Sequence, residues 1–357
     1  MTAPLLDLVE LGWDDSWREL ASAYPPPGDV GRVVRVDKTL CSVVTASGLV
    51  RASYGASLLD AVATDVRDAP CTGDWCLVRS WPDGPVTVEA VLERRTAVVR
   101  AASSGTSLGQ VLVANVDVLA VVVALHPEPN LSRIERLVTL AWESGGRPVV
   151  VLTKADLAPD AEMLADDVRV AAPGVEVIVC STVTGHGIED VRALVDGNLT
   201  LGLLGASGHG KSSLTNALVG AEVLTTKQIR DDGKGRHTSV RRELVPLPGG
   251  GAVIDTPGLR GVGLQEATQG LASTFPDIEA LVDECRFNDC SHETEPGCAV
   301  QSAIADGTLA ERRLDSWRRL RREMAWMASR TDARLRAEQL KKWKAITKHQ
   351  RHHKFRS

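Results

Sequence analysis

The sequence predicts a multidomain α/β protein with an N-terminal β-barrel, a central doubly wound sheet that is mostly parallel, and a helical C-terminal domain. Short alternating strands separated by turn residues follow the first thirty residues, and this pattern indicates a small barrel. From about residue 110, apolar runs alternate with helical segments, as in a parallel sheet with helices on both faces. After about residue 270 the pattern becomes helical. The 357 residues are enough for two or three domains.

Residues 1–30 are expected to be an N-terminal extension, which ends in the breaker Pro25-Pro26-Pro27-Gly28 and to which the sequence assigns no role. We expect the barrel over residues 31–100, with strands at 31–36, 42–45, 49–53, 75–79 and 86–92. An OB-fold is one barrel of this kind, and it often binds nucleic acid. The strand pattern alone does not distinguish it from an SH3-like barrel.

We expect the parallel sheet over residues 101–270, where Val-rich and Leu-rich runs alternate with helical segments. The expected strands are residues 118–125, 148–153, 175–181, 199–205, 242–247 and 252–255, and the expected helices are 131–144, 161–170 and one that begins at Lys211. Over residues 271–357 we expect a helical domain with a basic tail. Its apolar side chains recur at three- and four-residue steps, at Leu314, Trp317, Leu320, Met324 and Met327.

The net charge of −5 conceals a strong asymmetry. From Glu311 to Ser357, sixteen Lys and Arg residues stand against five Asp and Glu residues, a balance of +11 that leaves −16 for the rest of the chain. Such a tail favours RNA as a partner, because cations neutralise phosphates while aromatic rings stack on bases. A solvated helix with its own apolar face is the alternative. The rings of the tail are Trp326, Trp343, His349, His352, His353 and Phe355.

The sequence indicates a cytoplasmic protein. The most apolar segment, residues 111–125, is interrupted by Asn115 and Asp117, so we expect no membrane span. The N-terminus does not have the pattern of a signal peptide. The seven cysteines are an odd number, and three of them cluster with a histidine near residue 290. This favours a reducing compartment over a disulfide framework.

A phosphate-binding pattern, G-x-x-x-x-G-K-[ST], is matched by Gly205-Ala206-Ser207-Gly208-His209-Gly210-Lys211-Ser212. The segment follows an apolar strand and stands at the start of a predicted helix. Ser213 is the residue after the motif and belongs to the same predicted site. Backbone N–H groups would bind phosphate oxygens, Lys211 would reach the β- and γ-phosphates, and the Ser212 hydroxyl would bind Mg²⁺. A glycine-rich turn without a ligand is the alternative, and the flanking strand and helix argue against it.

Two further motifs are typical of nucleotide-dependent switches. Asp255-Thr256-Pro257-Gly258 follows a strand and matches D-x-x-G; Asp255 would hold Mg²⁺ through water, and the Gly258 amide would sense the γ-phosphate. Gly235-Arg236-His237-Thr238-Ser239 precedes it, and Thr238 would bind Mg²⁺ and the γ-phosphate when this loop becomes ordered. D-T-P-G can also be a simple turn, and Thr238 an ordinary loop residue.

Thr153-Lys154-Ala155-Asp156 follows a strand and resembles the guanine-reading element N-K-x-D. Asp156 would accept two hydrogen bonds from the N1–H and N2–H₂ groups of guanine, which adenine cannot offer. The stem of Lys154 would pack on the base, and Ser181 at the end of the next strand would help to hold it. Thr153 replaces the usual asparagine. A surface loop with a lysine and an aspartate is the alternative.

Cys285, Cys290, His292 and Cys298 offer four metal ligands within fourteen residues. Three thiolates and one imidazole suit tetrahedral structural Zn²⁺, and because all four positions are filled we expect a closed site. Chance clustering of reduced cysteines is the alternative. A redox role is disfavoured because the sequence has no C-x-x-C.

The order of the motifs is unusual, because the guanine-reading elements precede the P-loop and both switches. Circular permutation is physically acceptable, since domain termini usually lie close together. The permuted order, the preceding barrel and the Cys-Cys-His-Cys cluster resemble the ribosome small-subunit-dependent GTPase A family of bacteria. The resemblance covers about residues 30–350 and is most specific at residues 205–213, 235–239, 255–258 and 285–298.

This resemblance implies an OB-fold, a circularly permuted domain that hydrolyses GTP to GDP, and a zinc domain. It also implies binding to the small (30S) ribosomal subunit and its 16S rRNA late in maturation, with hydrolysis stimulated by the subunit. Leu259 stands where many GTPases carry the glutamine that positions water, so His237, backbone groups or the partner must act instead. We expect a monomer.

Two other functions remain open from the sequence. One is a nucleotide-gated RNA-binding module whose hydrolysis is incidental; a hydrolysis-deficient variant that still binds the subunit and fails to leave would distinguish it. The other is a metabolic P-loop kinase. It is disfavoured because Asp156 selects guanine over adenine and the sequence shows no substrate pocket.

Overall fold

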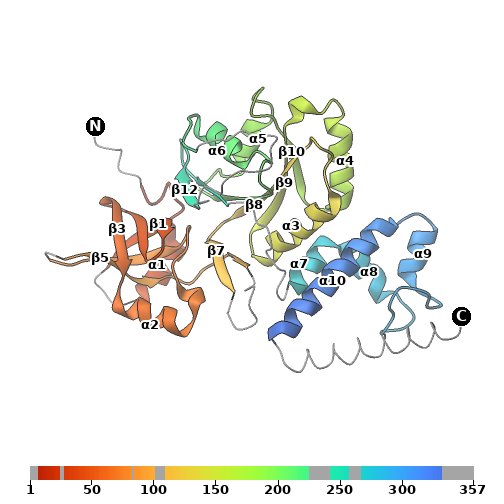
Figure 1. Ribbon diagram of the computed structural model, residues 1–357, viewed down its shortest axis with the longest axis horizontal. Coiled ribbons are helices and arrows are strands. Elements are labelled where there is room, and N and C mark those ends of the chain that lie inside the picture. Colours follow the sequence, from red (N-terminus) through yellow and green to blue (C-terminus); the bar gives the residue numbers. More distant parts are fainter. Residues whose placement is uncertain are drawn as a thin grey trace, which may run out of the picture.

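A computed structural model describes residues 7–24, 28–82, 84–100, 109–224, 242–256 and 267–331. These residues form a barrel, a sheet with helices on both faces and a helical C-terminal part, arranged in that order along the long axis (Figure 1). The predicted switch residues His237, Thr238 and Gly258 lie outside the described residues, as does the tail beyond Thr331. Among the described residues, no helix combines the length and the apolar character that a membrane span requires.

The barrel closes in the strand order β1-β2-β3-β5-β4. Its strands are β1 (Asp29–Asp37), β2 (Leu40–Thr45), β3 (Gly48–Tyr54), β4 (Trp75–Ser80) and β5 (Val86–Val91). Helix α2 (Ala56–Thr64) connects β3 to β4, and β3 pairs with β5 in parallel. A simple meander lacks this parallel closure, so the strand order confirms the predicted OB-fold.

The N-terminal extension packs where the barrel meets the central sheet. Helix α1 (Asp15–Ser22) begins at Asp14, which caps it by accepting a hydrogen bond of 2.8 Å from the Trp17 amide. Trp17 is buried. The ring of Trp13 makes an edge-to-face contact with the ring of Trp75 in the barrel, with 4.9 Å between the ring centroids. The Glu10 carbonyl accepts a hydrogen bond from the Gly251 amide, far along the chain. The extension is therefore an integral part of the fold.

A six-stranded sheet has the order β10-β9-β8-β11-β13-β12, and only β12 is antiparallel to its neighbour. The strands are β8 (Val118–Ala124), β9 (Arg147–Thr153), β10 (Glu176–Val179), β11 (Thr200–Leu204), β12 (Glu243–Pro246) and β13 (Ala252–Asp255). Helices α3 (Leu131–Glu143) and α4 (Ala161–Ala171) cover one apolar face, while α5 (Ile188–Ala193) and α6 (Lys211–Val219) cover the other. A short hairpin of β6 (Ala97–Arg100) and β7 (Gln110–Ala114) joins barrel to sheet. The predicted doubly wound sheet is thus confirmed.

The C-terminal part consists of α7 (Thr268–Thr274), α8 (Pro276–Asp283), α9 (Ala299–Ala305) and α10 (Glu311–Thr331). Helix α7 lies closely against α3, because a Cβ atom on Gly270 would come within 2.3 Å of the Thr139 carbonyl oxygen. The Gly270 amide donates to Glu143, and the hydroxyls of Thr139 and Thr274 are 3.1 Å apart. One apolar cluster runs from the extension through the sheet to α10.

A buried ionic network fixes α10 to the central domain. The Arg313 guanidinium donates to Glu135 of α3 at 3.2 Å, to the carbonyl oxygens of Ala171 and Thr274 at 2.7 and 2.8 Å, and to Asp277 of α8 at 2.8 Å. Glu135 is fully buried, so it depends on Arg313 and the neighbouring Arg312 for its charge balance.

We predict that Arg313→Ala lowers the free energy of unfolding by about 3–5 kcal/mol, because it leaves two buried carbonyls without this donor and the buried Glu135 carboxylate with only the more exposed Arg312 of the two arginines. Arg312→Ala is the matched control, since the Arg312 side chain is 38% exposed and the variant should cost much less. Urea titration monitored by tryptophan fluorescence measures both. Equal losses for the two variants would contradict the prediction.

Candidate nucleotide and metal sites

The predicted phosphate-binding loop lies where the central strands of the sheet end. Strand β11 pairs in parallel with β8 and β13, so the loops that follow these strands meet at one edge. At the first position of the loop, a Cβ atom on Gly205 would lie only 2.3 Å from the Val122 carbonyl oxygen of β8. Gly210 begins α6 with φ +87°, a conformation that favours glycine. The sequence motif therefore has the glycines that its geometry requires.

Lys211 is buried beneath this loop. Its ammonium donates to the carbonyl oxygens of Gly205 and Ala206, each at 3.0 Å. Burial lowers the pKa of Lys211 below its usual value, and the charge of Asp255 opposes this effect. Within the described chain, the hydrogen bonds of the Lys211 ammonium thus go to two neutral carbonyl oxygens. Charged phosphate oxygens would be stronger acceptors for it.

Ser212 and Asp255 form a pair beside Lys211. The Ser212 hydroxyl donates to Asp255 Oδ2 at 2.7 Å, and within the described chain Asp255 Oδ1 is buried with no hydrogen-bond partner. Burial raises the pKa of Asp255, although Ser212 and Lys211 act against it. A buried carboxylate oxygen without a partner beside a hydroxyl suits a hard cation such as Mg²⁺, which prefers oxygen ligands. The residues present therefore fit the predicted magnesium ion.

Thr153 connects the predicted guanine-reading loop to the predicted phosphate loop. Its hydroxyl donates to the His209 carbonyl oxygen at 2.8 Å, and the side chain is buried. A threonine hydroxyl has one proton, and the His209 carbonyl oxygen is its nearer acceptor, with the Val123 carbonyl oxygen at 3.4 Å. The His209 ring lies 3.2 Å, through Nδ1, from the Val122 carbonyl oxygen. Thr153 thus replaces the usual asparagine as a clamp on the phosphate loop.

The other residues predicted to read the base lie together. Lys154 adopts a left-handed backbone conformation, φ +61°, which is strained for a side chain other than glycine and often marks a functional site. The short 3₁₀ turn Ala155–Leu157 follows and presents Asp156 at the surface. The Ser181 hydroxyl donates to Asp156 Oδ1 and accepts from the amides of Val183 and Thr184. The arrangement leaves the second carboxylate oxygen of Asp156 available to a ligand.

The four predicted zinc ligands converge, with all four ligand atoms within 4.8 Å of one another. Cys285 Sγ lies 3.9 Å from Cys298 Sγ and 3.5 Å from His292 Nδ1, and Cys298 Sγ lies 3.6 Å from that nitrogen. Tetrahedral zinc with ordinary bond lengths would place sulfur atoms about 3.8 Å apart and sulfur and nitrogen about 3.6 Å apart. The spacing fits this ion.

The surroundings of the cluster hold its ligands in place. His292 is buried with φ +58°, and its ring meets the Trp317 ring of α10 at 5.7 Å between centroids. Gln301 and Arg318 donate to the His292 carbonyl oxygen. Cys298 caps α9 by accepting a hydrogen bond from the Gln301 amide at 3.4 Å. The cluster therefore joins the loop before α9 to α10.

The sequence did not reveal the Val122 carbonyl, which meets both Gly205 and the His209 ring. No local signal marks it, because the contact joins strands more than eighty residues apart. The structure brings Lys211, Ser212 and Asp255 together, and their roles toward phosphate and Mg²⁺ stay predictions. Gly258 and the switch residues His237 and Thr238 are not among the described residues, so their positions stay predictions.

We predict that Thr153→Val weakens the binding of GTP and GDP alike by about three- to tenfold, because the isosteric side chain cannot donate to His209. Thr153→Ser keeps the hydroxyl and should bind nearly as the parent does. Titration of a fluorescent guanine nucleotide gives the dissociation constants. Loss of guanine-over-adenine selectivity without loss of affinity would instead indicate direct contact of Thr153 with the base.

We predict one zinc ion per purified chain, lost together with several degrees of melting temperature in Cys298→Ser, since the site closes the loop before α9. Cys180→Ala, which changes a buried cysteine of the central domain, serves as the control and should keep its zinc. Elemental analysis and thermal unfolding measure both quantities. A full zinc content in Cys298→Ser would contradict the proposed ligand set.

The amino-acid sequence is similar to one GTPase family and to curated proteins of that family. A sequence model of the family described as RsgA GTPase matches residues 91–265. The small ribosomal subunit biogenesis GTPase RsgA of Streptomyces coelicolor is 52% identical over 343 residues, which are 94% of this chain and 92% of that relative. The protein of the same name from Streptomyces avermitilis is 50% identical over 342 residues, covering 94% of this chain and 91% of its own length.

Solved structures share the fold. YjeQ from Thermotoga maritima has a TM-score of 0.60 at 24% identity, over 84% of this chain and 99% of its own. YloQ, described as a circularly permuted GTPase, has a TM-score of 0.55 at 22% identity, over 86% and 97%. Together with the identity to curated relatives over most of the chain, these findings place the protein: it belongs to the RsgA GTPase family and is a circularly permuted GTP hydrolase.

Proposed function

We propose that this GTPase binds the small ribosomal subunit and acts in its late maturation, with GTP hydrolysis stimulated by the subunit. The observation that carries the proposal is the Ser212–Asp255 pair beneath a phosphate loop in a permuted sheet. Two relatives that are at least 50% identical to this chain and named small ribosomal subunit biogenesis GTPases support it.

The phosphate loop would bind the β- and γ-phosphates through backbone N–H groups of residues 205–213 and the N-terminus of α6. Lys211 would leave the carbonyls of Gly205 and Ala206 and pair with phosphate oxygens, which restores the pKa that burial lowers. Asp156 would read the guanine edge with its free oxygen, and Lys154 would pack on the base. Thr153 would hold the guanine-reading loop against the phosphate loop through its hydrogen bond to the His209 carbonyl oxygen.

Mg²⁺, when bound, would neutralise charge on the phosphate oxygens. Ser212 would hold it directly and Asp255 through water, while Thr238 of the first switch would add a second hydroxyl. The unpartnered Oδ1 of Asp255 supports this assignment. We propose that His237 positions the attacking water. Leu259 stands where many GTPases carry a glutamine for this task, and its side chain has no hydrogen-bonding group. The Gly258 amide would respond to the γ-phosphate.

The remaining parts would contact the subunit. The OB-fold, the zinc-binding part and the basic tail are the proposed contacts with 16S rRNA, because barrels of this kind and basic segments with aromatic rings both bind RNA. We assign residues 1–30 to the extension, 31–100 to the barrel, 101–270 to the GTPase domain and 271–357 to the zinc-binding domain with its tail. We propose that the protein is a monomer. We also propose that it is cytoplasmic, because the small ribosomal subunit that it would bind is cytoplasmic.

We predict that purified small subunits raise the rate of GTP hydrolysis at least tenfold, measured as released phosphate. Lys211→Ala should abolish both basal and stimulated hydrolysis, because it removes the cation that neutralises the phosphates. His237→Ala should lower stimulated hydrolysis by a factor of ten or more while GTP binding stays within about twofold.

The outcomes separate the alternatives. Unchanged stimulated hydrolysis in His237→Ala would remove this residue from the mechanism. A parent protein that binds GTP and the subunit without any stimulation would favour a nucleotide-gated binding module over a subunit-triggered enzyme.

A further inference from the structure

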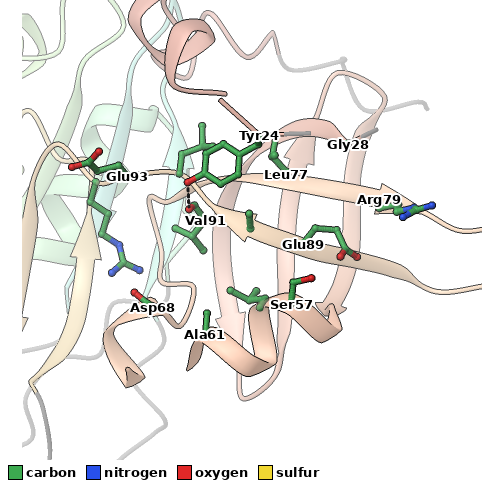
Figure 2. A pocket seen from close by; sticks show the side chains of 14 residues that line it. Tyr24, Gly28, Ser57, Ala61, Asp68, Leu77, Arg79, Glu89, Val91 and Glu93 are labelled. Carbon is green, nitrogen blue, oxygen red and sulfur yellow. Dashed lines mark hydrogen bonds between the residues drawn. The ribbon is translucent and has the colours of Figure 1, made fainter. Parts of the chain in front are cut away.

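A cavity of about 770 Å³ opens on the outside of the barrel, between α2, the β4–β5 hairpin and the end of the N-terminal extension (Figure 2). This volume lies within the range of known ligand pockets. None of its lining residues belongs to the nucleotide or metal site. The cavity is therefore a feature that the proposed function leaves unused.

The floor of the cavity is apolar, and the extension supplies one wall. Leu58 of α2 and Leu77 of β4 are buried, and Val91 of β5 lines the cavity with them. The Tyr24 ring stands above this floor in Figure 2, and its hydroxyl lies 3.4 Å from the Val91 carbonyl oxygen. The extension that has no role in the nucleotide site thus contributes an aromatic surface here.

A fixed carboxylate, Glu89, borders the floor on one side. The Thr87 hydroxyl donates to its Oε1, and Trp81 Nε1 in turn donates to Thr87 at 2.8 Å. A Cβ atom on Gly55 would lie 2.7 Å from both oxygens of Glu89, although Gly55 has φ −70°, which any residue adopts. Glycine here provides space for the carboxylate.

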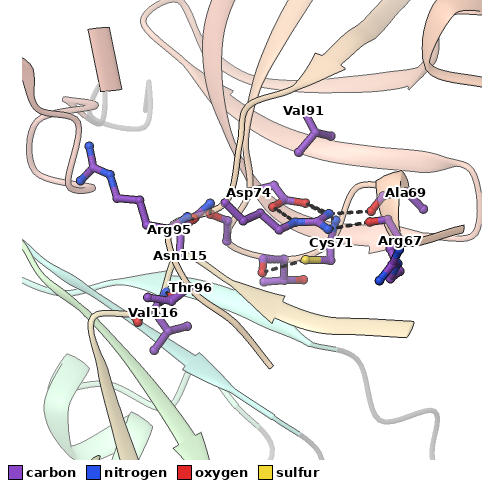
Figure 3. A network of polar contacts seen from close by, with 12 residues as sticks. Arg67, Ala69, Cys71, Asp74, Val91, Arg95, Thr96, Asn115 and Val116 are labelled. Atoms are coloured by element: carbon purple, nitrogen blue, oxygen red, sulfur yellow. Dashed lines mark hydrogen bonds and ion pairs between the residues drawn. The ribbon is translucent and has the colours of Figure 1, made fainter. Parts of the chain in front are cut away.

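A second carboxylate, Asp68, lies on the opposite side of the cavity in Figure 2. The nearby cation, Arg94, is already balanced, because it donates to both oxygens of the buried Asp74 at 2.7 and 2.8 Å. Its other donors meet the carbonyls of Arg67 and Ala69, in the network that Figure 3 shows. Asp68 therefore adds negative charge beside an arginine whose own hydrogen bonds go to Asp74 and to backbone carbonyls.

The remaining cation of the lining, Arg79, stacks on the Trp81 ring at 3.8 Å from its centroid, at the far side of Glu89. The cavity consequently combines an apolar floor, an aromatic wall and the carboxylates Glu89 and Asp68 on opposite sides, with Glu93 as a third carboxylate of the lining. Phosphate groups would be repelled by this charge, so RNA is a poor occupant. A cation joined to an apolar group is a good one, because an ammonium or guanidinium can meet a carboxylate and an aromatic face together.

We propose that this cavity binds a short segment of a partner protein in which an apolar side chain is flanked by lysine or arginine. The apolar side chain fills the floor between Leu58 and Val91, and the flanking cations reach Glu89 and Asp68. That the segment belongs to a basic protein of the small subunit rests on the proposed function. The binding chemistry itself does not.

The test is a calorimetric titration of the full-length protein with a capped six-residue peptide of alternating arginine and leucine. The double variant Asp68→Asn/Glu89→Gln should bind it at least tenfold more weakly than the parent does, and Gly55→Ala should also weaken binding by displacing Glu89. Asp60→Asn is the matched control, because Asp60 is exposed on the same helix outside the cavity and its loss should leave binding within twofold. The same peptide with glutamate in place of arginine should not bind.

Equal affinity of the parent and the double variant for the basic peptide would overturn the proposal. So would an oligouridine that competes with the peptide and binds more tightly to the double variant, since that result identifies RNA as the occupant. Basal GTP hydrolysis should be the same in all these variants. This readout also shows that the variants fold.

A second measurement concerns the source of the segment. The double variant should need a several-fold higher concentration of small subunits for half-maximal stimulation of hydrolysis, and an unchanged concentration would overturn the assignment to the subunit. Absence of any stimulation in the parent would refute the proposed function, while the peptide titration would still decide what the cavity binds.

Discussion

The nucleotide site depends on one close approach, where the phosphate loop passes the Val122 carbonyl at Gly205 with no space for a side chain. The same carbonyl meets the His209 ring, and Thr153 holds the His209 carbonyl from the neighbouring strand. The ends of β8, β9 and β11 thus fix the loop before a nucleotide arrives. Such preorganisation reduces the conformational entropy that binding would otherwise cost.

Helix α3 connects this site to the metal-binding part of the molecule. It follows β8, the strand that supports the phosphate loop, and it carries Glu135 of the buried ionic network with Arg313. Helix α7, the first described element after β13, packs on α3 so closely that Gly270 is required. Permutation therefore places α7, which follows the last strand of the six-stranded sheet, directly against α3, which follows the first strand of that sheet.

The parts of the fold that could be predicted from the sequence are those encoded locally. The phosphate loop and the four zinc ligands are short motifs, and the strands of the central sheet are continuous apolar runs, so their positions follow from neighbouring residues. The strand pattern alone could not distinguish the OB-fold from an SH3-like barrel, because the distinction depends on the parallel pairing of β3 with β5; the resemblance to a known family supplied that part of the prediction. Packing of Trp13 on Trp75 and the clamp at Thr153 likewise join segments distant in sequence.

The bond between Glu10 and Gly251 has a consequence for how the protein is made. The extension leaves the ribosome before the barrel does, and its tryptophans can pack as soon as the barrel has emerged. The Glu10 carbonyl, however, must wait for a residue 241 positions later in the chain. At ordinary rates of synthesis this delay is about 12–48 s. The extension, although it is translated before the barrel and the sheet, is thus among the last segments to acquire its full set of native hydrogen bonds.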